Sequence, residues 1–184
     1  MPDNGAMINT ISVQEAQAAA TPLPNRGRDS RLLDGLAIEQ LCLHYWNCID
    51  RLAGDEAAAL YVEDGRLVLG PMALAGRASI QQFLQTRNAA EVVARRTTRH
   101  VATNHRLVSV DGDRAVMTSL VAVYAAVGDL PQPAILPSSF GDFEDELIRD
   151  AHGDWRFVSR TGRLVLIGSA LPQFLKPAAT APGA

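Results

Sequence analysis

Apolar residues recur at helical spacing in the first third of the chain. Asp34 is the predicted N-cap, and the apolar positions from Leu36 to Ile49 give this helix one broad face that would pack against a core. Two shorter helical patterns follow, over about 55–61 and about 79–88. The chain is therefore predicted to begin with three helices.

A short hairpin is predicted between the second and third helices. Residues 63–65, Glu-Asp-Gly, are a turn signal. Residues 66–69 and 72–75 then form two short apolar runs around Gly70 and Pro71. We expect these two runs to pair.

The second half of the chain carries the pattern of long strands. Asp111-Gly112 stands between two apolar runs, which is the strongest short signal for a hairpin. Helices followed by antiparallel strands predict an α+β fold. We expect a cone-shaped α+β barrel, in which three N-terminal helices pack on a strongly curved mixed or antiparallel sheet around an apolar pocket. The predicted strands are 97–109, 113–127, 139–150 and 154–168.

Length and composition predict one folded domain with two loose ends. The chain has 184 residues, of which 47% are hydrophobic, enough for a core. Residues 1–30 are of low complexity and are predicted to be a flexible arm, 31–170 to be the cone domain, and 171–184 to be a loose tail. A net charge of -3 gives no basic signature, so no nucleic acid or membrane partner is expected.

Cysteine use and hydropathy predict a cytoplasmic protein. Cys42 and Cys48 are six residues apart on one helix, a poor spacing for a disulfide, so both are expected to be buried thiols in a reducing compartment. The sequence has no zinc-type Cys/His spacing, and neither a metal nor a cofactor is expected. No signal peptide is expected, because the first residues show no basic stretch followed by an apolar one, and no apolar run approaches about 18 residues.

The most unusual stretch is residues 95–107, because four arginines, two histidines and an asparagine interrupt a strand pattern. Local inconsistency of this kind is expected at functional sites. The alternative is an exposed edge strand, in which charges prevent further strand pairing. His100 and His105 lie five residues apart, so they should point to opposite faces unless a bulge intervenes. His100 shares its face with Ala102 and Asn104, and the small Ala102 leaves room for a ligand, so His100 is the predicted pocket residue.

A catalytic histidine needs a partner that fixes its tautomer and stabilises the imidazolium. Asp50 is the candidate, because it ends the first helix directly after Cys48-Ile49 and so lies at the border of the core. A carboxylate near a helix C-terminus also opposes the helix dipole, which suggests a use elsewhere. The alternative is a surface salt bridge with Arg51.

These stretches together resemble the SnoaL-like branch of the nuclear transport factor 2-like superfamily, over about residues 34–168. Their order and spacing carry the resemblance more than any single motif. They are Ala37 to Asp50 (AIEQLCLHYWNCID), the helix start at Gly76, Thr98 to Asn104 (TRHVATN), Val110 to Asp113 (VDGD) and Trp155 to Arg160 (WRFVSR).

The resemblance implies roles for the candidate residues. Scytalone dehydratase and hexachlorocyclohexane dehydrochlorinase types carry an aspartate at the end of the first helix and a His-x-x-x-Asn strand start, which Asp50, His100 and Asn104 match. This implies that His100 is a general base and that Asp50 orients it. The dehydrochlorinase type has a lysine where this chain has Tyr45, so halide elimination is not expected. A tyrosine suits hydrogen bonding to a hydroxyl or carbonyl group instead.

The expected activity is that of a cofactor-independent lyase, either a dehydratase or a related elimination, with retro-aldol loss of a small fragment left open. The substrate would be small, hydrophobic and aromatic with hydroxyl groups. Beyond the catalytic pair, Tyr45, Trp46, Asn104, Phe143 and Arg160 are the candidate substrate-binding residues. A pocket lining of Trp46, Phe83, Met117, Phe143 and Leu147 would accept such a molecule.

Three questions stay open at this level. Arg160 could contact the leaving group or pair structurally with Asp142 or Glu144 on the neighbouring strand. The chain could instead be a non-catalytic small subunit or assembly module of the ring-hydroxylase type, with the arginines of 95–99 at an interface, or an isomerase or cyclase of the same fold. In each case a homo-oligomer is expected, a trimer or a dimer, because long strands with two apolar faces need covering.

Overall fold

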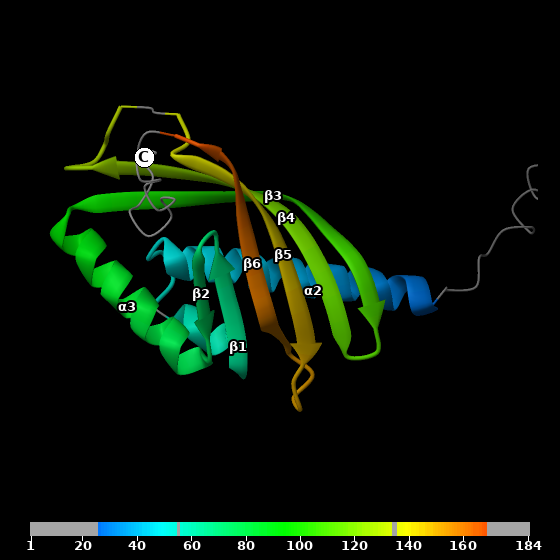
Figure 1. Cartoon of the computed structure of the whole chain (residues 1–184). Helices are drawn as coiled ribbons and strands as arrows, with labels where there is room; N and C mark the ends of the chain where they lie inside the picture. Colours follow the sequence, from blue (N-terminus) through cyan, green and yellow to red (C-terminus); the bar gives the residue numbers. More distant parts are fainter. Residues whose placement is uncertain (1–25, 55, 134–135, 169–184) are drawn as a thin grey trace, which may run out of the picture.

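The computed structural model describes residues 26–54, 56–133 and 136–168. Residues 1–25 of the predicted arm and the predicted tail at 171–184 lie outside these ranges. The described residues form an α+β fold with two α-helices, one short 3₁₀ helix and a six-stranded sheet (Figure 1). In chain order the elements are α2 (Arg26–Ile49), the 3₁₀ helix η1 (Glu56–Leu60), β1 (Tyr61–Leu69), β2 (Met72–Ala75), α3 (Arg77–Val93), β3 (Arg96–Asp111), β4 (Arg114–Val127), β5 (Ser139–Arg149) and β6 (Trp155–Ile167).

The sheet is mixed and open. Its strands follow the order β2-β1-β6-β5-β4-β3, and β1 runs parallel to β6 while the other neighbours are antiparallel. The expected cone-shaped barrel with a strongly curved sheet is therefore wrong, because β2 and β3 stand at opposite edges of the described sheet. Helix α3 occupies the space between these edges and packs against β1, β2 and β3 (Figure 1).

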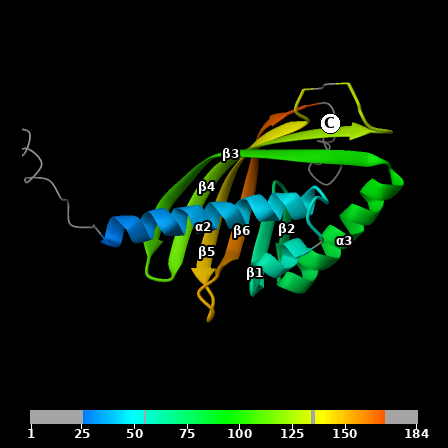
Figure 2. The same ribbon diagram turned by 180° about the vertical axis from the view of Figure 1, so that it is seen from behind.

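Helix α2 crosses one face of the sheet (Figure 2). It begins at Arg26, earlier than predicted, and Gly27 and Gly35 lie within it despite the low helix propensity of glycine. Asp34 is therefore inside the helix, where its carboxylate pairs with Arg149 of β5. The last five residues of the predicted arm are thus helical.

The predicted turn at residues 63–65 is also wrong, because these residues belong to β1. The β1–β6 register shifts between Tyr61 and Arg66, so β1 carries a bulge at this point. A Cβ on Gly65 would lie 2.8 Å from Cβ of Tyr61, so the bulge accepts only glycine without rearrangement. Gly65, which suggested a turn in the sequence, instead allows this bulge to form. The four long strands are confirmed to within one or two residues.

The core fills the space between α2 and the inner face of the sheet. Both cysteines are buried, as predicted, and burial raises the pKa of the Cys42 thiol. Because the core extends to the last turn of α2, the residue that follows this helix, Asp50, is buried as well. No helix in the described ranges is long and apolar enough to span a membrane. The α2 residues of the core are Ile38, Cys42, Tyr45, Trp46, Cys48 and Ile49.

Candidate active site

Asp50 and His100, fifty residues apart in sequence, lie in direct contact. The amide of Asp50 bonds the carbonyl of Trp46 at 2.9 Å, which continues α2 by one residue. Its carboxylate then makes two bonds to His100, since Oδ1 lies 2.6 Å from Nδ1 of the ring and Oδ2 accepts the backbone N–H at 2.7 Å. The two side chains are only 4% and 10% exposed. The aspartate therefore fixes both the imidazole and the strand that carries it.

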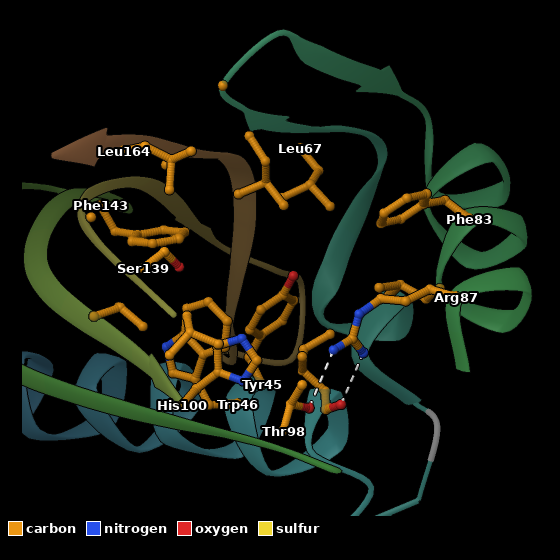
Figure 3. A pocket seen from close by; sticks show the side chains of 18 of the residues that line it. Tyr45, Trp46, Leu67, Phe83, Arg87, Thr98, His100, Ser139, Phe143 and Leu164 are labelled. Atoms are coloured by element: carbon orange, nitrogen blue, oxygen red, sulfur yellow. Dashed lines mark hydrogen bonds between the residues drawn. The ribbon is translucent and has the colours of Figure 1, made fainter. Parts of the chain in front are cut away.

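This geometry selects one tautomer of His100. A carboxylate only accepts hydrogen bonds, so Nδ1 carries the proton and Nε2 keeps its lone pair. The Trp46 indole stacks on the imidazole with the ring centroids 4.5 Å apart and the planes inclined by 14°. Figure 3 shows the stacked pair at one side of a pocket, beside Tyr45. The arrangement can accept a proton at Nε2.

The pocket beside His100 lies between α2, α3 and the inner face of the sheet, and holds about 800 Å³ of space free of protein atoms, including its opening to solvent. The cavity itself has a volume of about 90 Å³, which is below the range of about 300–1,000 Å³ that small-molecule sites occupy, so binding a substrate would require side chains around the pocket to move. Of the predicted lining residues, Met117 and Leu147 instead belong to the core. The apolar side chains around the pocket include Trp46, Ile49, Leu67, Leu69, Phe83, Leu84, Val121, Val123, Phe143 and Leu164.

Three of the candidate substrate-binding residues, Tyr45, Trp46 and Phe143, line the pocket. The Tyr45 ring projects into the space above His100, with its hydroxyl directed towards the pocket (Figure 3). Burial raises the pKa of Tyr45, while the positive charge of Arg160 opposes this rise, so the phenol remains a proton donor at neutral pH. Phe143 packs edge-on against Trp46, with centroids 5.2 Å apart and planes at 90°.

Arg160 lies beneath the pocket and is not among the residues that line it. Its side chain is fully buried and forms an ion pair with Asp145, with Nε 3.0 Å from Oδ1. The guanidinium carbon lies 4.2 Å from the ring centroid of Tyr45 and 4.7 Å from that of Trp46. Arg160 therefore supports the aromatic floor of the pocket, and its partner is Asp145, where the sequence suggested Asp142 or Glu144 instead.

Asn104 does not line the pocket, contrary to expectation. The β3–β4 register shifts between Thr103 and Arg106, and Asn104 adopts a left-handed backbone with φ of 53°. This bulge leaves Asn104 exposed, whereas the side chain of His105 is only 7% exposed and lies 3.5 Å from Glu39 of α2. Burial lowers the pKa of His105. Both histidines of β3 thus face α2. Strict alternation along the strand would place them on opposite faces, and the bulge between them removes this constraint.

The pocket has a polar end that sequence reasoning missed. Arg87 and Glu91 of α3 and Arg96 of β3 line it together with Thr98. Arg87 is mostly buried, and desolvation lowers its pKa while Glu91 opposes this effect. The i,i+4 spacing of Arg87 and Glu91 is visible in the sequence, but such pairs are common on exposed helix faces. Within the described ranges, no three His, Cys, Asp or Glu side chains are grouped to hold a metal ion.

The comparison with known families agrees with this architecture. Residues 30–161 match the SnoaL-like domain. The chain belongs to the SnoaL-like domain family. This family lies within the nuclear transport factor 2-like superfamily, as the sequence resemblance predicted. No curated protein matches this SnoaL-like chain.

Solved structures share the fold of this SnoaL-like domain at low identity. One, named "Putative Scytalone Dehydratase" from Novosphingobium aromaticivorans DSM 12444, is 23% identical with a TM-score of 0.67, covering 84% of this chain and 99% of its own. An NTF2-like protein with a cystatin-like fold from Novosphingobium aromaticivorans is 25% identical with a TM-score of 0.63, covering 87% and 100%. A "Putative Aromatic Ring Hydroxylase" from the same species is 22% identical with a TM-score of 0.59, covering 73% and 91%. These likenesses establish the fold and leave the reaction to be argued from the site.

Proposed function

We propose that this SnoaL-like protein is a cofactor-independent lyase that eliminates water from a small hydroxylated aromatic substrate. The observation that carries the proposal is the buried Asp50–His100 pair at the side of an apolar pocket. Base-promoted elimination needs a proton acceptor, a hydrogen-bond donor and exclusion of water, and the residues at this pocket can supply each of these.

In the proposed reaction, Nε2 of His100 removes a proton from a carbon adjacent to a carbonyl group. The electrons of the C–H bond form the carbon–carbon double bond, and the neighbouring hydroxyl group leaves as water after the imidazolium returns the proton to it. Asp50 stabilises the imidazolium in between. Positioned proton transfer of this kind contributes about 100- to 10,000-fold in rate.

Tyr45 is the proposed donor to the substrate carbonyl. Its hydroxyl is directed into the pocket beside His100 (Figure 3), and its raised pKa keeps the proton in place. A donor aimed at an oxygen on which negative charge develops lowers the barrier most effectively in a site that excludes water. Tyr45 would therefore stabilise the enolate that forms as His100 takes the proton.

The aromatic side chains around the pocket support an aromatic substrate. Trp46 and Phe143 meet at right angles beside His100, and Phe83 lies on the opposite side (Figure 3). A non-catalytic module would instead have its interior filled by bulky side chains. The open space beside His100 therefore favours an enzyme over a non-catalytic module. The similar structure named as a putative dehydratase supports elimination of water as the reaction.

The test is to replace His100 with alanine. Small aromatic hydroxyketones would be incubated with the protein in deuterated water, and proton exchange and alkene formation followed by NMR. We expect the His100→Ala variant to be slower by at least about 100-fold, with an unchanged circular dichroism spectrum. His152→Ala is the matched control, because His152 is exposed in the β5–β6 turn. A fully active His100→Ala variant would refute the proposed function.

A further inference from the structure

At the polar end of the pocket, the buried carboxylate of Glu91 forms ion pairs with arginines from three segments of the chain. Glu91, near the end of α3, is 8% exposed. Its Oε2 lies 2.6 Å from Nη1 of Arg51, and its Oε1 lies 2.9 Å from Nη2 of Arg87. Nε of Arg96 is 3.8 Å from Oε1. Arg51 follows α2, Arg87 belongs to α3 and Arg96 begins β3, so Glu91 joins all three segments.

Two of these arginines link the chain on either side of Asp50 to Glu91. Arg87 donates from Nη1 to the carbonyl of Ile49 at 3.1 Å, which is the residue before Asp50. Arg51 is the residue after Asp50, and its own side chain is bound to Glu91. The chain is therefore tied to Glu91 immediately before and immediately after the aspartate of the catalytic pair.

The same arginines also reach the strand that carries His100. Arg51 donates from Nη2 to the carbonyl of Arg96 at 2.8 Å. Arg87 donates from Nη2 to Oγ1 of Thr98 at 3.4 Å, two residues before His100. The end of α2 and the start of β3 are thus joined through one cluster, next to the place where Asp50 meets His100.

The backbone at Arg51 needs this support. Arg51 has φ of 58°, in the left-handed region that residues with a Cβ adopt only at a cost in free energy. A helix commonly ends with glycine in this conformation, whereas here an arginine does so and glycine comes later, at position 54. Strained residues persist where their surroundings hold them, and the 2.6 Å contact with Glu91 is such a restraint.

We propose that Glu91 is a positioning residue, which holds the end of α2 so that Asp50 keeps the Nδ1–H tautomer of His100 in place. The kinetic part of this inference rests on the proposed function. Without the carboxylate, two neighbouring guanidinium groups would be left with a reduced counter-charge and would repel each other. Arg51 and Arg87 would then separate, releasing the turn after Asp50 and the carbonyl of Ile49.

The test compares Glu91→Gln with Asp34→Asn. Asp34 is an equally buried carboxylate on α2 that pairs with Arg149, so the control loses a similar ion pair far from His100. The imidazole nitrogens of His100 are followed by NMR on ¹⁵N-histidine-labelled protein. In Glu91→Gln we expect the His100 Nδ1–H signal to weaken and the Nε2–H tautomer to appear, while Asp34→Asn keeps the wild-type pattern.

Turnover provides the second readout. We expect kcat of Glu91→Gln to fall by about 10- to 100-fold, the size of effect seen when groups that orient metal-binding histidines are removed. A wild-type His100 spectrum in Glu91→Gln would overturn the inference, as would an equal change in Asp34→Asn. The NMR readout needs no turnover, so an active His100→Ala variant would refute the lyase without deciding this question.

A second variant covers the case in which Glu91→Gln does not fold. Arg51→Met removes one of the two links to Glu91 but keeps a Cβ, so the left-handed backbone stays strained and loses its restraint. The same change in the His100 tautomer is expected, in a smaller proportion of molecules, because Arg87 still holds the carbonyl of Ile49. An unchanged tautomer in Arg51→Met would contradict the proposed role of the cluster.

Discussion

Replacing Asp50 with asparagine should place the proton of His100 on the wrong nitrogen. In the native site the two carboxylate oxygens face two donors, the backbone N–H of His100 and its Nδ1–H. An asparagine has one oxygen and one amide group. The backbone N–H can only donate, so the oxygen would turn to it and the NH₂ group would face Nδ1. Nδ1 would become the acceptor, and Nε2 would carry the proton and cease to be a base.

The size of the effect follows from the geometry of the pair. With Nδ1 and Oδ1 2.6 Å apart, the centres of charge of an imidazolium and a carboxylate lie about 4 Å apart. At an effective dielectric constant of about 20, their attraction is about 4 kcal/mol, and water screens it little because both side chains are buried. A loss of about 4 kcal/mol from the transition state corresponds to about a thousandfold in rate.

The assay is the exchange and elimination measurement proposed above, with the His100 tautomer followed by NMR in parallel. We expect Asp50→Asn to lose about a thousandfold in kcat, with a smaller change in KM, and to show the Nε2–H form. Asp34→Asn serves as the control for loss of a buried carboxylate on the same helix. Turnover within tenfold of the wild type, or retention of the Nδ1–H form, would refute this account of the pair.

Three further changes test the surroundings of the pocket. Arg160→Met should lower the free energy of unfolding in urea by about 3–5 kcal/mol, because it leaves Asp145 charged and unpaired in the core. His105 has a pKa lowered by burial from 6.5, so the unfolded chain binds its proton more readily; stability should fall as the pH drops below about 6.5, and less so in His105→Gln. A Cβ at Gly162 would lie 2.6 Å from Cζ of Phe143, so Gly162→Ala should displace this ring and raise KM for aromatic substrates by about tenfold.

Each of these changes has a matched control. The double variant Arg160→Met/Asp145→Leu should regain most of the lost stability, because no unpaired charge remains; a failure to regain it would point to packing as the cause. His152→Gln should leave the pH dependence unchanged, since this histidine is exposed. Gly35→Ala adds a Cβ 3.5 Å from the nearest carbon of Leu107, an ordinary contact, and should leave KM unchanged.

Local patterns predicted most of the helices and strands, but they did not predict which strands form the edges of the sheet or whether the sheet closes. The ends of β3 and β4 could be predicted because the dipeptide Asp111-Gly112 is by itself a strong signal for a hairpin turn. Whether a sheet closes depends on pairing between its first and last strands, which are far apart in the chain. Here α3 continues to Val93, beyond the predicted end at residue 88, and fills the space that a closed barrel would need for β2 and β3 to meet.

The candidate site shows the same division at the scale of single residues. Asp50 and His100 were found because each is unusual in its own segment, a carboxylate at a helix end and a histidine in a strand. The outward turn of Asn104 was not predictable, because one inserted residue in β3 reverses which side chains face α2, up to a second register shift after Leu107. The roles of Glu91 and Arg160 were not predictable either, since a charged residue looks the same in a sequence whether it is exposed or buried with a partner. The residues proposed to do the chemistry were thus visible in the sequence, whereas those proposed to hold them in place required the structure.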